Sequence, residues 1–250
     1  MGRDICRRKQ LGQDDVGKAV VREEKAGELG GQMTSAKDCL VLTGYDDNGA
    51  KIGDLTSELM AKYAVRHGFS FKCNRKYEVD TFSSWQKLGL VRRELLGYDL
   101  VLWIDMDVVV TNPAIDFRNI EEHFDGLIFS YDWEYKEPHA DMFSAGVFIA
   151  KHCPRSFRFL DEAMTLTKYS KRENYITTDQ GALREVYGSS CEWRDCVRVV
   201  PHHVLNAVPT EVQPKSISPW VPGNFLCHLT GIDNDRRVDL FHKFAPKEPT

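Results

Sequence analysis

Short apolar runs alternate with amphipathic segments from residue 39 to residue 244, and polar or Gly-containing turns separate them. Apolar runs of four to eight residues between turn signals are typical of buried strands. The predicted strands are Cys39–Thr43, Phe69–Cys73, Val101–Ile104, Gly126–Tyr131, Phe143–Ala150, Cys196–Val200 and Asn224–His228.

Between these strands, apolar residues recur at the spacing of one helix face. The predicted helices are Leu55–His67, one from Ser83 or Ser84 to about Leu96, one opened by Pro154, one that begins near Thr177, and Arg236–Phe244. Strands joined by a helix pair in parallel through a right-handed crossover. The chain is therefore predicted to be an α/β protein with a mostly parallel central sheet flanked by helices.

The N-terminal segment differs from the rest, because residues 1–36 are rich in charge, Gly and Gln and hold few large apolar side chains. This composition predicts a disordered arm over residues 1–36, with a weak helix over Val16–Lys25 as the alternative. Residues 37–250 contain no internal repeat and no second boundary, so they are predicted to form one domain.

Composition limits the classes of binding partner and the cellular compartments that are expected for this protein. The net charge of −4 gives no electrostatic case for a nucleic-acid partner. No apolar run approaches the roughly 18 residues of a membrane span, and the N-terminus lacks the apolar core of a signal peptide. These features predict a cytoplasmic protein or a soluble fragment without a membrane span. The seven cysteines are odd in number and scattered, which favours unpaired thiols, with a Cys191–Cys196 disulfide as the alternative.

The stretch LVLWIDMDVVVTNP at Leu100–Pro113 carries the clearest chemical signal, because Asp105 and Asp107 interrupt an apolar run. Acids at the end of a buried strand are costly to bury unless a positive charge lies beside them. A divalent cation bound to a phosphate supplies that charge, since hard cations take carboxylate and phosphate oxygens as ligands. Two solvated acids at a strand end are the alternative.

Other polar or small residues fall at the same edge of the predicted sheet, since α/β sheets bind ligands at the carboxyl ends of their strands. Thr43, Gly44 and Tyr45 follow the first strand, and His228 ends the last one. Ser144-Ala145-Gly146 begins a strand with side chains small enough for a ligand to approach the backbone. A structural histidine and a close contact with another strand are the alternatives.

Two predicted helices add charged and polar groups. Lys87 and Arg92 lie off the apolar stripe of their helix, where they form a solvated face or are directed at a ligand. Asp179 and Gln180 lie in the first turn of a helix capped by Thr177 or Thr178. An acid at this position also stabilises the helix itself.

In this order and spacing, the chain resembles a glycosyltransferase of the GT-A fold, and in particular the galactosyl-, mannosyl- and xylosyltransferase family of fungi and plants. The resemblance covers roughly Cys39 to Phe244, and WIDMDVVVTNP, similar to the family's strand ending in Asp-x-Asp, is its most specific part. WQKLGLVRREL resembles the preceding helix, FSAGVFIAK an Asn-Ala-Gly strand with Ser144 in place of Asn, TTDQGALREV an Asp-Gln helix, and GNFLCHLTG a late His-Phe-x-Gly strand. The family often has a basic residue soon after this Gly, and here Arg236 or Arg237 can take its place.

The resemblance implies a single GT-A (Rossmann-like) domain that moves a hexose or pentose from a nucleotide-diphosphate sugar to a hydroxyl group of a glycan acceptor. UDP-sugars are the commoner donors with this motif, and GDP-sugars are the alternative. Asp107 and His228 would bind Mn²⁺ or Mg²⁺. Asp105 would contact either the ribose, or the metal through a water molecule. The residues implied to hold the donor are Thr43, Gly44, Tyr45, Lys87, Arg92, Asp105, Ala145 and Gly146.

The implied chemistry is coherent in physical terms. Breaking a sugar–phosphate bond builds negative charge on the diphosphate, which a metal and cationic side chains stabilise. The imidazole of His228 tilts the choice of metal toward Mn²⁺. Asp179 and Gln180 would lie near the acceptor or the anomeric carbon. An inverting enzyme also needs a carboxylate base, for which Asp141 and Asp179 are the candidates, whereas a retaining enzyme does not.

Two other functions fit parts of the sequence. IDMDVV matches the strand of haloacid-dehalogenase-type phosphatases, with Asp105 as nucleophile. That motif usually opens its domain, however, and two β-α units precede it here. The second alternative is a non-catalytic module that binds sugar nucleotides or glycans on the same fold, against which the presence of both Asp105 and Asp107 argues.

Overall fold

The computed structural model describes residues 38–77, 83–120, 124–132, 142–170, 178–216 and 219–247. All of them belong to one unit, Lys37–Thr250. The predicted arm over residues 1–36 lies outside the described residues, and so does Asp141. Within the described part of the chain, none of the helices has the length and apolar character needed to cross a membrane.

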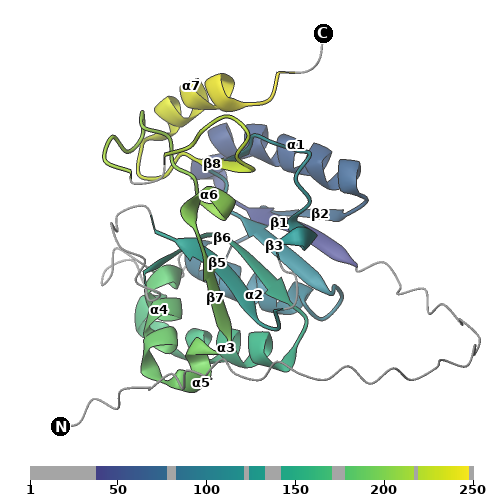
Figure 1. Ribbon diagram of the computed structural model, residues 1–250, viewed down its shortest axis with the longest axis vertical. Helices are drawn as coiled ribbons and strands as arrows, with labels where there is room; N and C mark the ends of the chain where they lie inside the picture. Colours follow the sequence, from purple (N-terminus) through teal and green to yellow (C-terminus); the bar gives the residue numbers. More distant parts are fainter. Residues whose placement is uncertain are drawn as a thin grey trace, which may run out of the picture. The chain divides into compact units, whose positions relative to one another are not determined.

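The described residues include a central sheet of six strands. These are β1 (Cys39–Gly44), β2 (Ser70–Asn74), β3 (Leu100–Ile104), β5 (Leu127–Tyr131), β6 (Phe143–Lys151) and β7 (Val197–Val200). They lie in the order β2-β1-β3-β6-β5-β7, and β1 pairs in parallel with β2 and β3, as β5 does with β7. The predicted α/β fold with a mostly parallel sheet flanked by helices is confirmed (Figure 1).

Strand β6 departs from the parallel pairing expected by default, because it runs antiparallel to both β3 and β5. Its register with β5 runs from Leu127 opposite Ala150 to Tyr131 opposite Phe143. The connection between the two strands, residues 132–142, is shorter than the crossover of a dozen or more residues that parallel strands require. Antiparallel pairing follows from this short connection.

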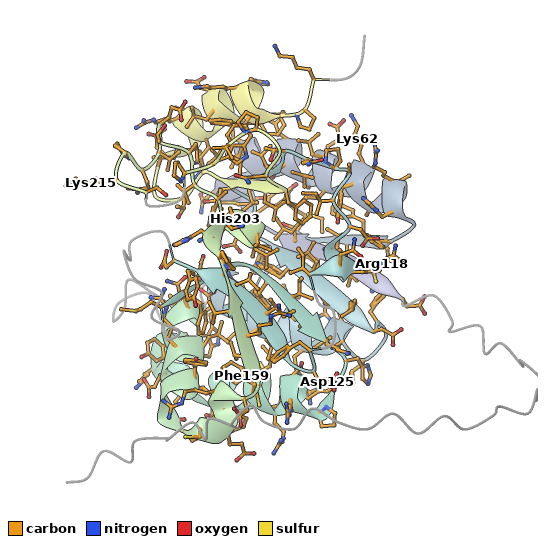
Figure 2. All side chains as sticks on the ribbon, in the orientation of Figure 1. Lys62, Arg118, Asp125, Phe159, His203 and Lys215 are labelled. Atoms are coloured by element: carbon orange, nitrogen blue, oxygen red, sulfur yellow. The ribbon has the colours of Figure 1, made fainter. Side chains whose placement is uncertain are left out.

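Both faces of the central sheet are buried, which explains why its strands read as continuous apolar runs. Along β1, Leu40 and Leu42 belong to the core on one face and Val41 to the core on the other. Helices α2 (Ser83–Glu94), α3 (Pro154–Thr165) and α4 (Asp179–Ser189) pack on the first face, and α1 (Ala50–His67) packs on the second. Figure 2 shows the side chains of these layers, with Phe159 labelled on α3.

The long helices agree with the predictions, and the short ones were not predicted. α1 begins before the predicted Leu55, because Asp46 caps a 3-10 turn, Asp47–Gly49, that leads into it. The last helix, α7, spans Asn234–Phe244. The remaining helical segments are α5 (Cys191–Arg194), α6 (His202–Leu205) and the 3-10 turns Phe117–Asn119 and Thr167–Tyr169. One-turn segments of this kind are too short to carry a periodic apolar pattern.

A second, two-stranded sheet joins the motif stretch to the end of the chain. β4 (Val108–Val110) pairs antiparallel with β8 (Leu226–His228), so that Val108 lies opposite His228. Apolar residues of this sheet, of α1 and of α7 form a separate core cluster that includes Ile52 and Phe241. β4 was not predicted as a strand of its own, because the apolar run continues from β3 through the two acids into β4.

The cysteines agree with the prediction of unpaired thiols, since no disulfide occurs among those that the structure describes. Cys196 is buried, and its thiol lies 3.4 Å from the Glu192 carbonyl oxygen. Burial also raises the pKa of the Cys227 thiol well above its usual range. The Cys191–Cys196 disulfide, the alternative from sequence, is not formed.

Candidate functional site

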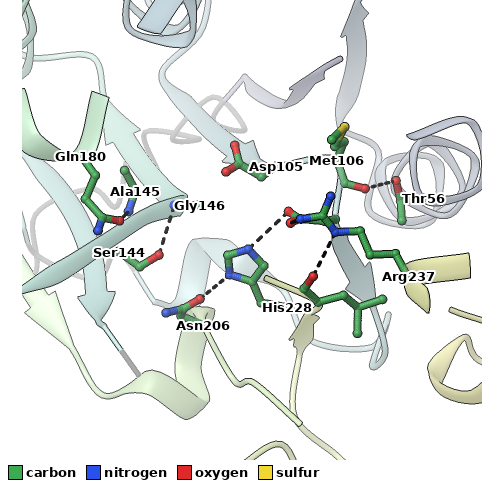
Figure 3. A network of polar contacts seen from close by, with 12 residues as sticks. Thr56, Asp105, Met106, Ser144, Ala145, Gly146, Gln180, Asn206, His228 and Arg237 are labelled. Carbon is green, nitrogen blue, oxygen red and sulfur yellow. Dashed lines mark hydrogen bonds and ion pairs between the residues drawn. The ribbon is translucent and has the colours of Figure 1, made fainter. Parts of the chain in front are cut away.

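The two acids of the motif lie in the tight turn Asp105–Asp107 between β3 and β4. The first amide of this turn donates to the Gly146 carbonyl of β6 at 2.8 Å. Its middle carbonyl accepts a hydrogen bond from the buried Thr56 hydroxyl of α1 at 2.7 Å (Figure 3). These two hydrogen bonds fix the backbone of the turn, from which the side chains of Asp105 and Asp107 extend toward different neighbours.

Asp105 belongs to a buried ionic cluster around Lys87 of α2. Lys87 Nζ lies 3.0 Å from Asp105 Oδ1 and 2.8 Å from Asp179 Oδ2 of α4. It also donates to the Ala145 carbonyl at 3.0 Å, so acceptors are present for all three ammonium protons. Burial lowers the pKa of Lys87, but the two carboxylates raise it further, and the net shift is upward. A solvated face is therefore wrong for Lys87, which is 2% exposed.

Asp105 has a second internal donor. Trp103 Nε1, on the preceding strand, donates to Asp105 Oδ1 at 2.6 Å. The Asp105 side chain nevertheless keeps 30% of its surface exposed. Its negative charge is thus balanced from within the protein, while one edge of the carboxylate stays open to a neighbouring pocket.

Asp107 faces a different pair of groups. Its Oδ1 lies 3.3 Å from His228 Nε2 of β8, and its Oδ2 accepts from the Arg237 guanidinium of α7 at 2.7 Å (Figure 3). Arg237 also donates to the Leu229 carbonyl at 3.1 Å and to Asn234 Oδ1 at 2.9 Å. Burial alone would raise the pKa of Asp107, but His228 in its protonated form and the Arg237 guanidinium lower it well below its usual range. Asp107 is therefore an ionised carboxylate with its charge directed at His228.

The small sheet and β6 together fix the position of His228. Its amide donates to the Ala207 carbonyl at 2.9 Å, and its Nδ1 lies 2.6 Å from Asn206 Oδ1. The imidazole packs against the backbone of Gly146, where an added Cβ would lie 2.5 Å from His228 Cε1. The small residue predicted for close backbone approach thus makes room for a side chain of the same site.

Replacing Gly146 with alanine is expected to push the His228 ring out of place. Because the ring lies against backbone and buried neighbours, we expect unfolding to become easier by about 1–3 kcal/mol. Chemical denaturation measures the effect. Gly188→Ala is the matched control, because a Cβ at Gly188 of α4 meets no atom within 4 Å. Equal behaviour of the two variants would contradict the packing argument.

A pocket of about 150 Å³ lies beside the two acids. It is lined by Gly44, Tyr45, Asp46, Tyr77, Ser83, Ser84, Trp103, Asp105, Met106 and Asp107. The predicted end of the first strand and the motif acids therefore meet at one edge of the sheet. Thr43 lies behind this wall, and within the described residues its buried hydroxyl has no hydrogen-bond partner.

Tyr45 lines the pocket, but its ring is covered on the protein side. The Arg75 guanidinium lies 4.2 Å from the ring centroid, and a Cβ on Gly53 would lie 2.5 Å from Tyr45 Cγ. The Tyr45 hydroxyl contacts Asp54 Oδ1 at 2.8 Å and Ser57 Oγ at 3.0 Å. Burial raises the pKa of Tyr45 to about 12. The hydroxyl is thus anchored within the protein.

The structure does not bring Arg92 to this cluster. Arg92 pairs with Asp161 of α3 through Nε at 2.6 Å and Nη2 at 3.1 Å. Its side chain is 34% exposed, on the outer side of the helical layer. Of the two cations predicted on this helix, Lys87 contacts the motif and Arg92 does not.

Gln180 connects α4 to the start of β6. The resemblance to the family implied that these two segments both lie near the transferred sugar. The Ala145 amide donates to Gln180 Oε1 at 2.9 Å, and Gln180 Nε2 donates to Asp132 Oδ2 at 3.2 Å. The neighbouring acid, Asp179, has a side chain that is 8% exposed and accepts from the Thr178 hydroxyl at 3.0 Å.

Three residues of this region were not predicted from the sequence. Asp132 is buried at the end of β5 and binds Arg184 of α4 at 2.7 Å. Its position after an apolar strand resembles that of Asp105, and this pattern could have identified it. Asn206, the partner of His228, carries no such signal, because it lies in an irregular segment far from its partner in the sequence.

A divalent metal ion at this site would require oxygen or nitrogen ligand atoms that face one another. Asp107 and His228 fit, since a carboxylate oxygen and an imidazole nitrogen face each other, and phosphate oxygens would complete the coordination of Mn²⁺. Asp105 is directed toward Lys87 and Trp103 instead. In the part of the chain that the structure describes, no three His, Cys, Asp or Glu side chains are placed to hold a metal together.

Comparisons of sequence identify no relative, since no family model and no curated protein matches the chain. Comparison of structures gives 117 matching chains. A glycosyltransferase involved in the glycosylation of the major capsid of PBCV-1 is 15% identical with a TM-score of 0.63, and the match covers 82% of this chain and 99% of that one.

Two further solved structures have the same fold. The galactosyltransferase LgtC, in complex with donor and acceptor sugar analogs, is 13% identical with a TM-score of 0.53, over 84% of this chain and 97% of its own. The glycosyltransferase GlyE of Streptococcus pneumoniae is 12% identical with a TM-score of 0.55, over 86% of this chain and 66% of its own. At these identities the likeness establishes a GT-A fold.

Proposed function

We propose that this protein is a metal-dependent glycosyltransferase that moves a hexose or pentose from a UDP-sugar to a hydroxyl group of a glycan. The observation that carries the proposal is the pairing of β4 with β8, which brings His228 to Asp107 at the carboxyl end of the central sheet. This occurs beside the pocket that Asp105 lines, on a fold found in solved glycosyltransferases. The same edge of an open α/β sheet is where ligands bind.

The leaving diphosphate would lie between the metal site and Arg237. A bound Mn²⁺, or Mg²⁺ in its place, supplies positive charge for the phosphate oxygens, and Asp107 and His228 are the residues that would hold it. The Arg237 guanidinium reaches Asp107 and is fixed by Leu229 and Asn234, so it is preorganised for an anion beside Asp107. This favours Arg237 over Arg236, which donates to the Glu211 carbonyl.

The nucleotide would occupy the pocket, and the sugar would lie over the start of β6. Gly44 and Tyr45 form one wall of this pocket and Asp105 another. Ala145 and Gly146 would border the transferred sugar through their backbone, since the Ala145 side chain is buried and His228 fills the space over Gly146. Arg92 is left out of the proposed donor site because its guanidinium is engaged with Asp161.

Asp179 and Gln180 support the proposed sugar site from behind. The Asp179 carboxylate is bound by Lys87, and Gln180 holds the Ala145 amide. We therefore assign Asp179 a positioning role toward Lys87 and Ala145 rather than the role of general base. Asp141 stays the candidate base of an inverting reaction, and a retaining reaction needs none.

The alternative functions receive less support. A phosphatase with Asp105 as nucleophile is less favoured, because Lys87 and Trp103 both donate to Asp105 Oδ1 and so reduce the nucleophilicity of the carboxylate, and because the fold is found in solved glycosyltransferases. A non-catalytic sugar-nucleotide-binding module would keep the pocket without turning the donor over, so turnover distinguishes it from the transferase.

The test of the proposal is calorimetric titration of UDP and of GDP, each with Mn²⁺ and with a chelator, followed by an assay of nucleotide release from a panel of UDP-sugars. We expect UDP to bind only with Mn²⁺, and one UDP-sugar to be turned over faster when a glycan is added. Failure of both nucleotides to bind would overturn the proposal, and Mg²⁺-dependent phosphatase assays would follow. Binding without release of UDP would indicate the non-catalytic module.

A further inference from the structure

Asn206 is placed to control the chemistry of His228 without touching the proposed metal or substrate. We propose that Asn206 is a positioning residue that fixes the tautomer of His228, so that Nδ1 carries the proton and Nε2 presents its lone pair beside Asp107. The consequence for metal binding rests on the proposed function, whereas the tautomer itself is a property of the metal-free protein.

The position of Asn206 is defined by the backbone on both sides. It directly follows the short helix α6, and its amide donates to the His202 carbonyl at 2.7 Å. The next residue, Ala207, accepts from the His228 amide at 2.9 Å. Asn206 is only 1% exposed, so its side chain meets protein groups rather than water.

The orientation of the Asn206 amide follows from its second partner. Asn206 Nδ2 donates to the Tyr131 carbonyl oxygen at 3.2 Å. A carbonyl oxygen only accepts, so the NH₂ group must face Tyr131, and Oδ1 is left to face His228. The reversed amide would set two oxygens against each other in a buried place, at a cost of about 1–3 kcal/mol.

The orientation of the amide determines which nitrogen of His228 carries the proton. Asn206 Oδ1 lies 2.6 Å from Nδ1, and an amide oxygen can only accept there, so Nδ1 is the donor. In the neutral imidazole the lone pair is then on Nε2, which lies 3.3 Å from Asp107 Oδ1. In the neutral ring two acceptors face each other across this distance, a conflict that either a proton on Nε2 or a metal ion held by both groups removes.

The ring has no other orientation that serves both contacts. A half-turn of the imidazole would place Cδ2 against Asn206 and Cε1 against Asp107, and both polar contacts would be lost. The backbone of Gly146 lies against the ring, and β8 holds the His228 backbone opposite Val108. The protein thus presents Nε2 to Asp107 before any ligand binds.

This arrangement matches the general way in which proteins prepare a histidine ligand. A hydrogen bond accepted from the second ring nitrogen fixes the tautomer and the ring plane, and its loss typically weakens metal binding by about 10- to 100-fold. Asn206 supplies that acceptor from a segment distant in sequence from His228. We therefore expect Asn206 to affect metal affinity although it contacts neither metal nor nucleotide.

The test combines nuclear magnetic resonance with metal titration on four variants. Long-range proton–nitrogen correlation spectra of the metal-free protein, recorded where the ring is neutral, report which nitrogen carries the proton, and His228→Gln identifies the signal among the eight histidines. We expect a protonated Nδ1 in the wild type and in Asn206→Asp, which keeps an acceptor for Nδ1 although it loses the donor to the Tyr131 carbonyl. We expect the proton on Nε2 in Asn206→Leu.

Mn²⁺ affinity, measured without nucleotide by electron paramagnetic resonance, is expected to fall about 10- to 100-fold in Asn206→Leu and to be retained in Asn206→Asp. Asn224→Leu is the control, because Asn224 Oδ1 binds the Val221 amide just before β8 and leaves His228 untouched. A wild-type proton on Nε2, or unchanged spectra in a folded Asn206→Leu, would overturn the proposal. A protein that binds no Mn²⁺ but has the expected tautomer would instead refute the proposed metal dependence.

Discussion

Lys87→Met is expected to reduce the free energy of unfolding by about 3–5 kcal/mol, the largest stability effect that this site allows. The lost attraction between Lys87 and the two carboxylates is not the main cause of this decrease in stability. Methionine leaves the buried carboxylate of Asp179 and the partly exposed carboxylate of Asp105 next to each other without a cation, and it also leaves the Ala145 carbonyl without its donor. Urea denaturation at neutral pH measures the change.

The same helix offers a matched control. Arg92→Met removes a two-point ion pair with Asp161, but this pair is 34% and 47% exposed and should contribute about 0–1 kcal/mol. A second variant, Lys87→Met combined with Asp179→Asn, should recover part of the loss, because it removes one of the two uncompensated charges. Equal losses in Lys87→Met and Arg92→Met would show that Lys87 is not the buried centre of a charge cluster.

The helix α2 also illustrates how far sequence reasoning extends. Its apolar stripe correctly predicted a helix, since periodic burial is a local property of the sequence. The environment of Lys87 could not be predicted in this way, because it depends on Asp105 of one turn and Asp179 of another helix, which are distant in sequence. A lysine off the apolar stripe is usually solvated, and only the tertiary fold encloses this one.

The same reasoning applies to the site as a whole. The apolar strands and their positions along the chain were predicted because a strand that is buried on both faces has a continuous run of apolar residues. The motif acids were identified because they interrupt such a run. The reversal of β6, the strand β4 and the role of Asn206 depend on pairings between distant segments. The spacing of apolar and polar residues within one segment does not indicate which distant segment it pairs with.

The two acids of the motif have separate partners, although one residue separates them. Asp105 is balanced by Lys87 and Trp103 on the side of α2, and Asp107 by His228 and Arg237 on the side of the small sheet. The turn between β3 and β4 causes this division. Both carboxylates thus line the pocket of the proposed reaction, but only Asp107 faces His228.

Asp107→Asn is expected to lower metal-dependent sugar transfer by about 10³-fold, because a metal contributes several kcal/mol to stabilising a leaving phosphate. Asparagine keeps the size of the side chain and an acceptor for Arg237, but it carries no charge to hold Mn²⁺ beside His228. Turnover of the UDP-sugar and Mn²⁺-dependent binding of UDP measure the effect. Asp161→Asn, on the outer face of α3, is the control and should leave both unchanged.

Asp105→Asn distinguishes the division of roles from a three-ligand metal site. If Asp105 serves the pocket and Lys87, its replacement weakens UDP binding but leaves the affinity for Mn²⁺ alone close to that of the wild type. Asp107→Asn lowers both, since Asp107 is the carboxylate that faces His228. Equal loss of Mn²⁺ affinity in the two variants would place Asp105 among the direct metal ligands. Retention of Mn²⁺-dependent UDP binding in Asp107→Asn would contradict the proposed site.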